Sequence, residues 1–84
     1  MVTVEIFSSP SCGYCVRAKK LLTAVGAAFV ERDISSSEHR EEFVRRLPRV
    51  RSVPQIFIDE IHIGGFEDLE ILQNSGRLNE LLSA

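Results

Sequence analysis

The sequence predicts an α/β fold in which helices flank a four-stranded mixed β-sheet, in the order β-α-β-α-β-β-α. Three observations carry this prediction: a strand-helix-strand unit in the first 34 residues, two short strands spaced for a hairpin, and helical spacing of apolar residues after them. The chain has 84 residues and is 44% hydrophobic, enough for one small core and too little for two. We therefore expect a single domain over residues 1–84.

The first half of the chain predicts a parallel strand pair. Residues 2–7 alternate in the manner of a strand and are followed by a Ser-Ser-Pro turn. From Cys15 to Val25, apolar residues recur every three or four positions, which is typical of an amphipathic helix, and Gly26 is its expected end. A second strand is expected over residues 28–34. The long crossover predicts that the two strands are parallel neighbours.

The middle of the chain predicts a second helix. Ser35 and Glu38 form an S-x-x-E capping box at its start, and Pro48 is expected to end it. Three apolar residues are expected to be buried by it: Phe43, Val44 and Leu47.

The last third predicts a hairpin followed by helices. Residues 55–58 and 61–63 form short β-like runs that are close enough to pair antiparallel. From Phe66 the apolar spacing becomes helical, with acidic residues in the first turn, and Gly76 is expected to end this helix. A short leucine stripe over residues 78–82 predicts a final helical turn.

Composition excludes several classes of function. The chain carries 10 basic and 12 acidic residues, a net charge of −2, which gives no overall attraction for nucleic acid or anionic lipid. No apolar run approaches the roughly 18 residues needed to span a bilayer, and no signal-peptide pattern stands at the start. We expect a cytoplasmic protein with neither nucleic acid nor membrane as a partner.

Both cysteines, Cys12 and Cys15, lie at the start of the first predicted helix. A structural disulfide between them would close a very small loop and add little stability. A zinc site needs two more ligands, and His39 and His62 are too far apart for an H-x3-5-H pair. A [2Fe–2S] cluster needs four ligands, so it would require a dimer or an external thiol.

Redox chemistry is the interpretation that the position of the pair favours. Backbone N–H groups and the dipole at a helix N-terminus stabilise a thiolate, which predicts Cys12 as a nucleophile. Cys15 lies one turn further in and is the expected resolving thiol. The basic residues that follow, Arg17, Lys19 and Lys20, are expected to form a solvated helix face.

Two further motifs each allow a structural and a functional interpretation. Val53-Pro54 before a strand is either an edge-strand start or a cis peptide bond that leaves the Val53 backbone free to pair with an extended substrate. Gly64-Gly65 is either a flexible lead into a helix or, with the acidic residues after it, a site for a carboxylate and an ammonium group. Arg51 could meet a second carboxylate. Glutathione, with a carboxylate and an ammonium at one end, a central thiol and a far carboxylate, fits this set of groups.

Taken together, the motifs resemble the dithiol glutaredoxins over essentially the whole chain. Three segments carry the resemblance: Cys12-Gly13-Tyr14-Cys15, Ser52-Val53-Pro54-Gln55-Ile56-Phe57-Ile58 and His62-Ile63-Gly64-Gly65-Phe66-Glu67-Asp68-Leu69. The resemblance implies a thioredoxin-like fold and a glutathione-dependent thiol-disulfide oxidoreductase that reduces glutathione mixed disulfides and protein disulfides. It implies a monomer whose partners are glutathione, glutathionylated or disulfide-containing proteins such as ribonucleotide reductase, and indirectly glutathione reductase.

The resemblance also assigns a glutathione groove. It implies that Tyr14 flanks the sulfur, that Val53 before cis-Pro54 pairs with the cysteinyl backbone, and that the γ-glutamyl end is held by the segment Gly65, Phe66, Glu67 and Asp68.

The sequence departs from the family pattern at three places. Ser8-Ser9 stands where the family usually has Lys, and Arg51 is the expected substitute. Gly13 replaces a common Pro, and some members with Cys-Gly-Tyr-Cys bridge a [2Fe–2S] cluster between two subunits, so cluster binding through Cys12 is an alternative function. Phe66 stands where Cys or Ser is common. A second alternative is an electron donor to ribonucleotide reductase that is recharged by thioredoxin reductase.

Overall fold

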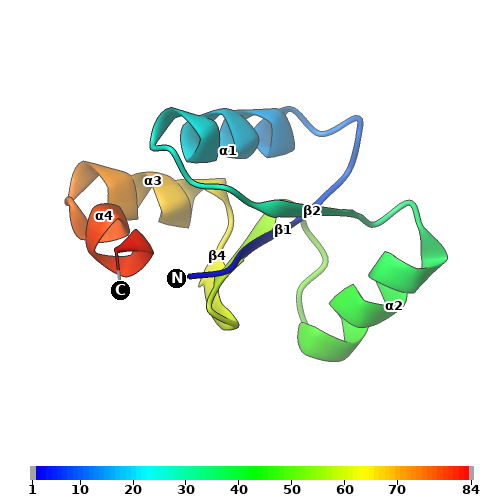
Figure 1. The fold of residues 1–84 in the computed structure, drawn as a ribbon. Coiled ribbons are helices and arrows are strands. Elements are labelled where there is room, and N and C mark those ends of the chain that lie inside the picture. The colour runs from blue at the N-terminus through cyan, green and yellow to red at the C-terminus, as the bar shows by residue number, and fades with distance from the viewer. Residues whose placement is uncertain (1, 84) are drawn as a thin grey trace.

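The computed structural model describes residues 2–83. In that part of the chain, the strands and helices confirm the predicted order, and the final turn is a six-residue helix (Figure 1). The elements are β1 (Val4–Ser8), α1 (Gly13–Ala24), β2 (Val30–Asp33), α2 (Ser37–Arg46), β3 (Gln55–Ile58), β4 (Ile61–Gly64), α3 (Phe66–Asn74) and α4 (Arg77–Leu82).

The sheet is mixed, with the strand order β2-β1-β3-β4. β1 runs parallel to β2 and antiparallel to β3, and β3 and β4 form the predicted antiparallel hairpin. The two turn residues of the hairpin, Asp59 and Glu60, have φ values of 50° and 67°. Two successive left-handed residues are the signature of a type I′ turn, whose twist matches that of the strands it joins.

β1 is a central strand, and both of its faces are covered. Val4 and Ile6 pack against α1, α3 and α4, whereas Phe7 belongs to a separate cluster that includes Phe43 of α2 and Phe57 of β3. Figure 1 shows α2 set apart from the other helices, in agreement with this division. The alternation predicted for β1 therefore separates two buried faces, and the whole strand is buried.

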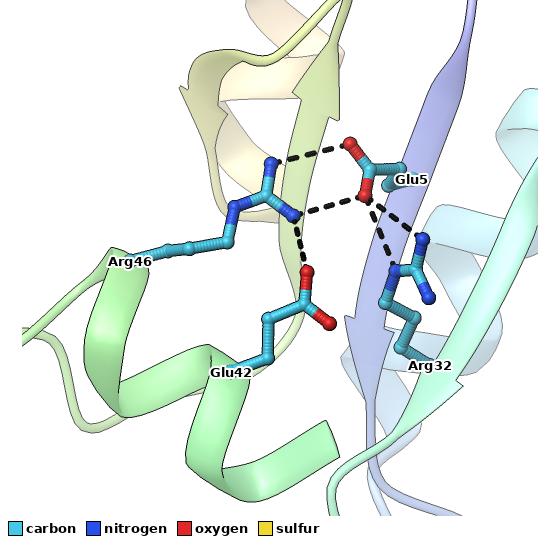
Figure 2. A network of polar contacts seen from close by, with 4 residues as sticks. All are labelled: Glu5, Arg32, Glu42 and Arg46. Carbon is cyan, nitrogen blue, oxygen red and sulfur yellow. Dashed lines mark hydrogen bonds and ion pairs between the residues drawn. The ribbon is translucent and has the colours of Figure 1, made fainter. Parts of the chain in front are cut away.

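Glu5 is the charged residue of this buried strand. Its carboxylate accepts hydrogen bonds from Arg46 at 2.9 and 3.2 Å and from Arg32 at 3.2 Å, and Arg46 also contacts Glu42 (Figure 2). Hydrogen bonds from Arg46 and its charge, followed by the hydrogen bond and charge of Arg32, lower the pKa of Glu5, although burial opposes the shift. The pairing is what allows a carboxylate that is only 6% exposed to stay ionised.

Two details predicted for α2 are wrong. Val44 is 55% exposed, because it follows Phe43 by one residue, about 100° around the helix, and α2 buries only a narrow stripe. Ser36, and not Ser35, is the N-cap residue, and its side chain makes no capping hydrogen bond. The Ser35 hydroxyl donates instead to Asp33 at 2.8 Å, as is typical of Asp in a turn.

Candidate active site

Cys12 is the N-cap residue of α1. Its Sγ accepts a hydrogen bond from the backbone N–H of Cys15 at 3.4 Å, one of the N–H groups that a helix start leaves without an intrahelical partner. Cys12 is partly exposed and Cys15 is completely buried, and both thiols are free. The position of Cys12 at the start of the helix confirms the placement predicted from sequence.

The two thiols differ in acidity. Burial works against ionisation of Cys12, but hydrogen bonds from the Cys15 thiol and from the backbone N–H groups of Cys15 and Tyr14 lower the pKa of Cys12 overall. Burial, together with the hydrogen bond and charge of Cys12, raises the pKa of Cys15 to about 11. The site therefore favours a thiolate on the accessible sulfur and a protonated thiol on the buried one.

The loop before β3 lies against Cys12. The Val53-Pro54 peptide bond is cis, and the Cys12 thiol donates to the Val53 carbonyl oxygen with an Sγ to O distance of 3.5 Å. Forty-one positions separate these two residues in the sequence. The fold thus places a backbone carbonyl beside the sulfur, on a loop whose Pro54 is buried.

The Asp68 side chain folds back onto the start of α3. Asp68 accepts a hydrogen bond from the backbone N–H of Gly65, the N-cap residue, at 3.0 Å. Gly64 has a φ of 123°, and a Cβ at that position would collide with the Asp68 carboxylate. Glycine is therefore required at Gly64, both for its backbone conformation and for the close approach of Asp68.

These segments surround a groove of about 410 Å³. Seven of the eight residues predicted to bind glutathione line it: Tyr14, Val53, Pro54, Gly65, Phe66, Glu67 and Asp68. Arg51 is exposed and does not line the groove. Ser8 does not line it either: it is buried, and its hydroxyl donates to Glu31 at 2.8 Å.

Three lining residues were not predicted from the sequence: Ser52, Gln55 and Ile71. Ile71 follows Glu67 by four residues, so helical spacing was the signal that placed it on the same face of α3. Ser52 and Gln55 flank the Val53-Pro54 pair directly.

Arg17 stacks on two aromatic rings beside the groove. Its guanidinium lies 5.4 Å from the ring centroid of Tyr14 and 4.7 Å from that of Phe66, and the two rings are 6.1 Å apart. Such cation–π contacts hold the half-exposed Tyr14 ring at the edge of the groove. Arg17 is therefore more than the solvated helix face expected from the sequence, and its i, i+3 spacing from Tyr14 was the available signal.

Other features of residues 2–83 lie away from the cysteines. A hollow of about 580 Å³ is lined by the Glu5 network, whose charges already pair with one another. Across the same residues, no cluster of three or more His, Cys, Asp or Glu side chains could hold a metal ion. Among the helices described, none has the length and apolar character needed to cross a membrane.

Comparison with known proteins identifies the family. The family model described as Glutaredoxin matches residues 4–63. The chain belongs to the glutaredoxin family. The resemblance predicted from its motifs is thus confirmed, and with it the thioredoxin-like fold and thiol-disulfide oxidoreductase activity.

Two relatives of this glutaredoxin match along almost their whole length. It is 47% identical to glutaredoxin 3 of Escherichia coli K12, covering 98% of this chain and 99% of the relative. It is 45% identical to a glutaredoxin of Neisseria meningitidis, with 99% of each chain covered.

Solved structures of other glutaredoxins have the same fold as this chain. The glutaredoxin of Brucella melitensis is 47% identical with a TM-score of 0.82, over 98% of this chain and 89% of the other. A buckwheat glutaredoxin solved in complex with glutathione is 30% identical with a TM-score of 0.88, over 98% of this chain and 77% of the other. The family uses glutathione as a co-substrate.

Proposed function

We propose that this glutaredoxin reduces glutathione mixed disulfides and protein disulfides at the expense of glutathione, with Cys12 as the nucleophile and Cys15 as the resolving thiol. The observation that carries the proposal is the position of the Cys12 sulfur, at the start of α1 and 3.5 Å from a carbonyl of the groove. A substrate sulfur held in the groove would meet this thiolate directly.

Reduction of a glutathione mixed disulfide needs only Cys12. Its thiolate attacks the glutathionyl sulfur, the old S–S bond breaks, and the protein leaves as a thiolate that takes up a proton. The glutathionyl group is now bonded to Cys12. The thiolate of a second glutathione attacks the glutathionyl sulfur, which forms glutathione disulfide and returns Cys12 as a thiolate.

Reduction of a protein disulfide needs both cysteines. The Cys12 thiolate attacks one sulfur of the protein disulfide and forms a mixed disulfide with it. The S–S bond of the protein breaks, and its other sulfur leaves as a thiolate that takes up a proton. Cys15 loses its proton and attacks the Cys12 sulfur, which releases the reduced protein and leaves a Cys12–Cys15 disulfide. Two glutathiones then restore the dithiol, and glutathione reductase recycles the glutathione disulfide. Ribonucleotide reductase is a protein substrate that this chemistry would serve.

Bound glutathione would extend from Cys12 along the groove. We assign the cysteinyl backbone to Val53 and the γ-glutamyl end to the start of α3, where N–H groups favour a carboxylate and Asp68 favours an ammonium. Tyr14 would flank the sulfur. We assign the glycyl carboxylate to Arg51, whose exposed side chain precedes the lining residue Ser52.

A [2Fe–2S] cluster does not fit the donors of one chain. The cluster needs four ligands, the chain has two thiols, and Cys15 is completely buried. No step of the proposed reaction passes through a cluster.

The test is NADPH-coupled reduction of a small glutathione mixed disulfide in the presence of glutathione and glutathione reductase. We expect wild type and Cys15→Ser to be active and Cys12→Ser to be inactive, because a hydroxyl does not ionise near neutral pH. Ser11→Ala, at the exposed neighbouring position, is the matched control. If wild type is inactive yet is reduced by thioredoxin reductase, the proposal is wrong and the protein is a thioredoxin-dependent donor.

A further inference from the structure

A run of side-chain hydrogen bonds connects the edge strand β4 to the loop beside Cys12. His62 of β4 lies with its Nε2 2.7 Å from the Oε1 of Gln55, the first residue of β3. The Nε2 of Gln55 donates to the Ser52 carbonyl at 3.0 Å, with the Ser52 hydroxyl at 3.4 Å. This relay ends at the residue before Val53.

The direction of the relay follows from hydrogen-bond chemistry. A backbone carbonyl only accepts, so the group of Gln55 that faces Ser52 must be the amide NH₂. The Oε1 of Gln55 then faces His62 as an acceptor, and the Nε2 of His62 must carry the proton. Neutral His62 is therefore the Nε2–H tautomer, with Nδ1 unprotonated.

The exposed His62 side chain stacks on one neighbour, whereas Gln55 is buried. The His62 ring lies 5.1 Å from the ring of its cross-strand partner Phe57, centroid to centroid, with the planes tilted by 35°. Gln55 is 6% exposed and is one of the residues that line the groove. A buried amide with both ends bonded is costly to rotate, because rotation leaves polar groups without partners.

We infer that His62 is a positioning residue for the disulfide substrate: through Gln55 and Ser52 it fixes the loop that carries the Val53 backbone beside the Cys12 sulfur. The inference rests on the proposed function, in which the Val53 backbone pairs with the substrate. His62 itself does not line the groove. Its effect should therefore appear in substrate affinity and leave the acidity of Cys12 unchanged.

The kinetic test compares two replacements of His62. His62→Phe retains a ring to stack on Phe57 and loses the donor, whereas His62→Gln offers an amide N–H at nearly the position of Nε2. We expect His62→Phe to raise KM for the glutathione mixed disulfide about tenfold, the equivalent of about one hydrogen bond, with kcat within about twofold. We expect His62→Gln to restore KM to within about twofold of wild type.

The control is the other histidine of the chain, His39 of α2, as His39→Gln, for which we expect wild-type kinetics. The rate of Cys12 alkylation against pH should be the same in all variants. An unchanged KM in His62→Phe would overturn the inference, as would equal losses in His62→Phe and His62→Gln, or a lower kcat at constant KM.

A second measurement is independent of glutathione. Nitrogen NMR of the imidazole ring should identify the Nε2–H tautomer of neutral His62 in wild type, and backbone order parameters of Ser52 and Val53 should fall in His62→Phe. The Nδ1–H tautomer would overturn the relay. If wild type does not turn over the mixed disulfide, the proposed function fails, while the tautomer and the order parameters still decide whether His62 orders the loop.

Discussion

Resolution by Cys15 should be strongly dependent on pH. Burial is the main reason that the pKa of Cys15 is raised to about 11, and the hydrogen bond and charge of Cys12 add to it. When Cys12 is held in a mixed disulfide, its charge is gone and only burial continues to oppose ionisation. The pKa of Cys15 in that intermediate therefore falls, and we expect it to stay above the ordinary thiol value of about 8.5.

The size of the effect follows from the fraction of thiolate. With a pKa of about 11, only about one Cys15 in ten thousand is ionised at pH 7, and even an ordinary thiol is ionised to only about 3%. Below the pKa that fraction rises tenfold with each pH unit. If Cys15 attacks as a thiolate, the resolving rate should rise nearly tenfold per unit between about pH 6 and pH 8.

Stopped-flow mixing with an aryl disulfide that releases a coloured thiolate separates the two steps. Attack by Cys12 appears as a phase whose rate depends on reagent concentration, and attack by Cys15 as a second release whose rate does not. Cys15→Ser should lose the second phase and retain the first. A resolving rate that is flat between about pH 6 and pH 8 would refute the reasoning, because Cys15 would then already be ionised in the intermediate.

Three further predictions concern the framework of the site. Arg46→Met should lower the free energy of unfolding by about 2 to 4 kcal/mol, because it leaves the buried Glu5 carboxylate with one partner fewer. Urea denaturation measures this loss, and a loss below about 0.5 kcal/mol would contradict the prediction. Since the pKa of Glu5 is lowered in the folded state, its contribution is present above the ordinary carboxyl pKa of about 4.3 and is lost as the pH falls through the folded value. Stability should therefore fall less steeply in acid for Glu5→Gln than for wild type, and equal slopes in acid unfolding would exclude Glu5 as a source. Gly64→Ala should destabilise the protein by about 2 kcal/mol or more and raise KM for the mixed disulfide, since the new methyl group displaces the Asp68 carboxylate. The matched control is Gly13→Ala, whose new methyl group would extend into open space. It should change the free energy of unfolding by less than about 0.5 kcal/mol.

Local signals in the sequence were sufficient for most of the fold. The periods of the apolar residues identified each helix and strand, because burial on one face depends on positions only a few residues apart. Gly26 and Gly76, expected to end helices, have φ values of 78° and 80°, which few other residues adopt. The position of Cys12 at the start of α1 could be predicted for the same reason, because it depends only on residues nearby in the sequence.

The sequence was a poorer guide to burial and to side-chain contacts, because these depend on residues from distant parts of the chain. The sequence predicts that Val44 is buried with Phe43. In the structure Phe43 faces the sheet and Val44 is exposed to solvent. Nothing in β1 alone indicated that Glu5 would be buried, because the two arginines that pair with it come from β2 and α2. The stacking of Arg17 on Phe66 likewise joins α1 to α3.

The sequence by itself determined which sulfur atoms are available, their one-turn spacing and their place at a helix start, since all three are properties of adjacent residues. Only the tertiary structure decided their surroundings. It brought Val53 to within 3.5 Å of Cys12 across 41 positions and placed the start of α3 along the same groove. It also buried Cys15 completely, the main cause of its raised pKa. These features depend on how the layers of the sheet and the helices pack, which no local pattern specifies.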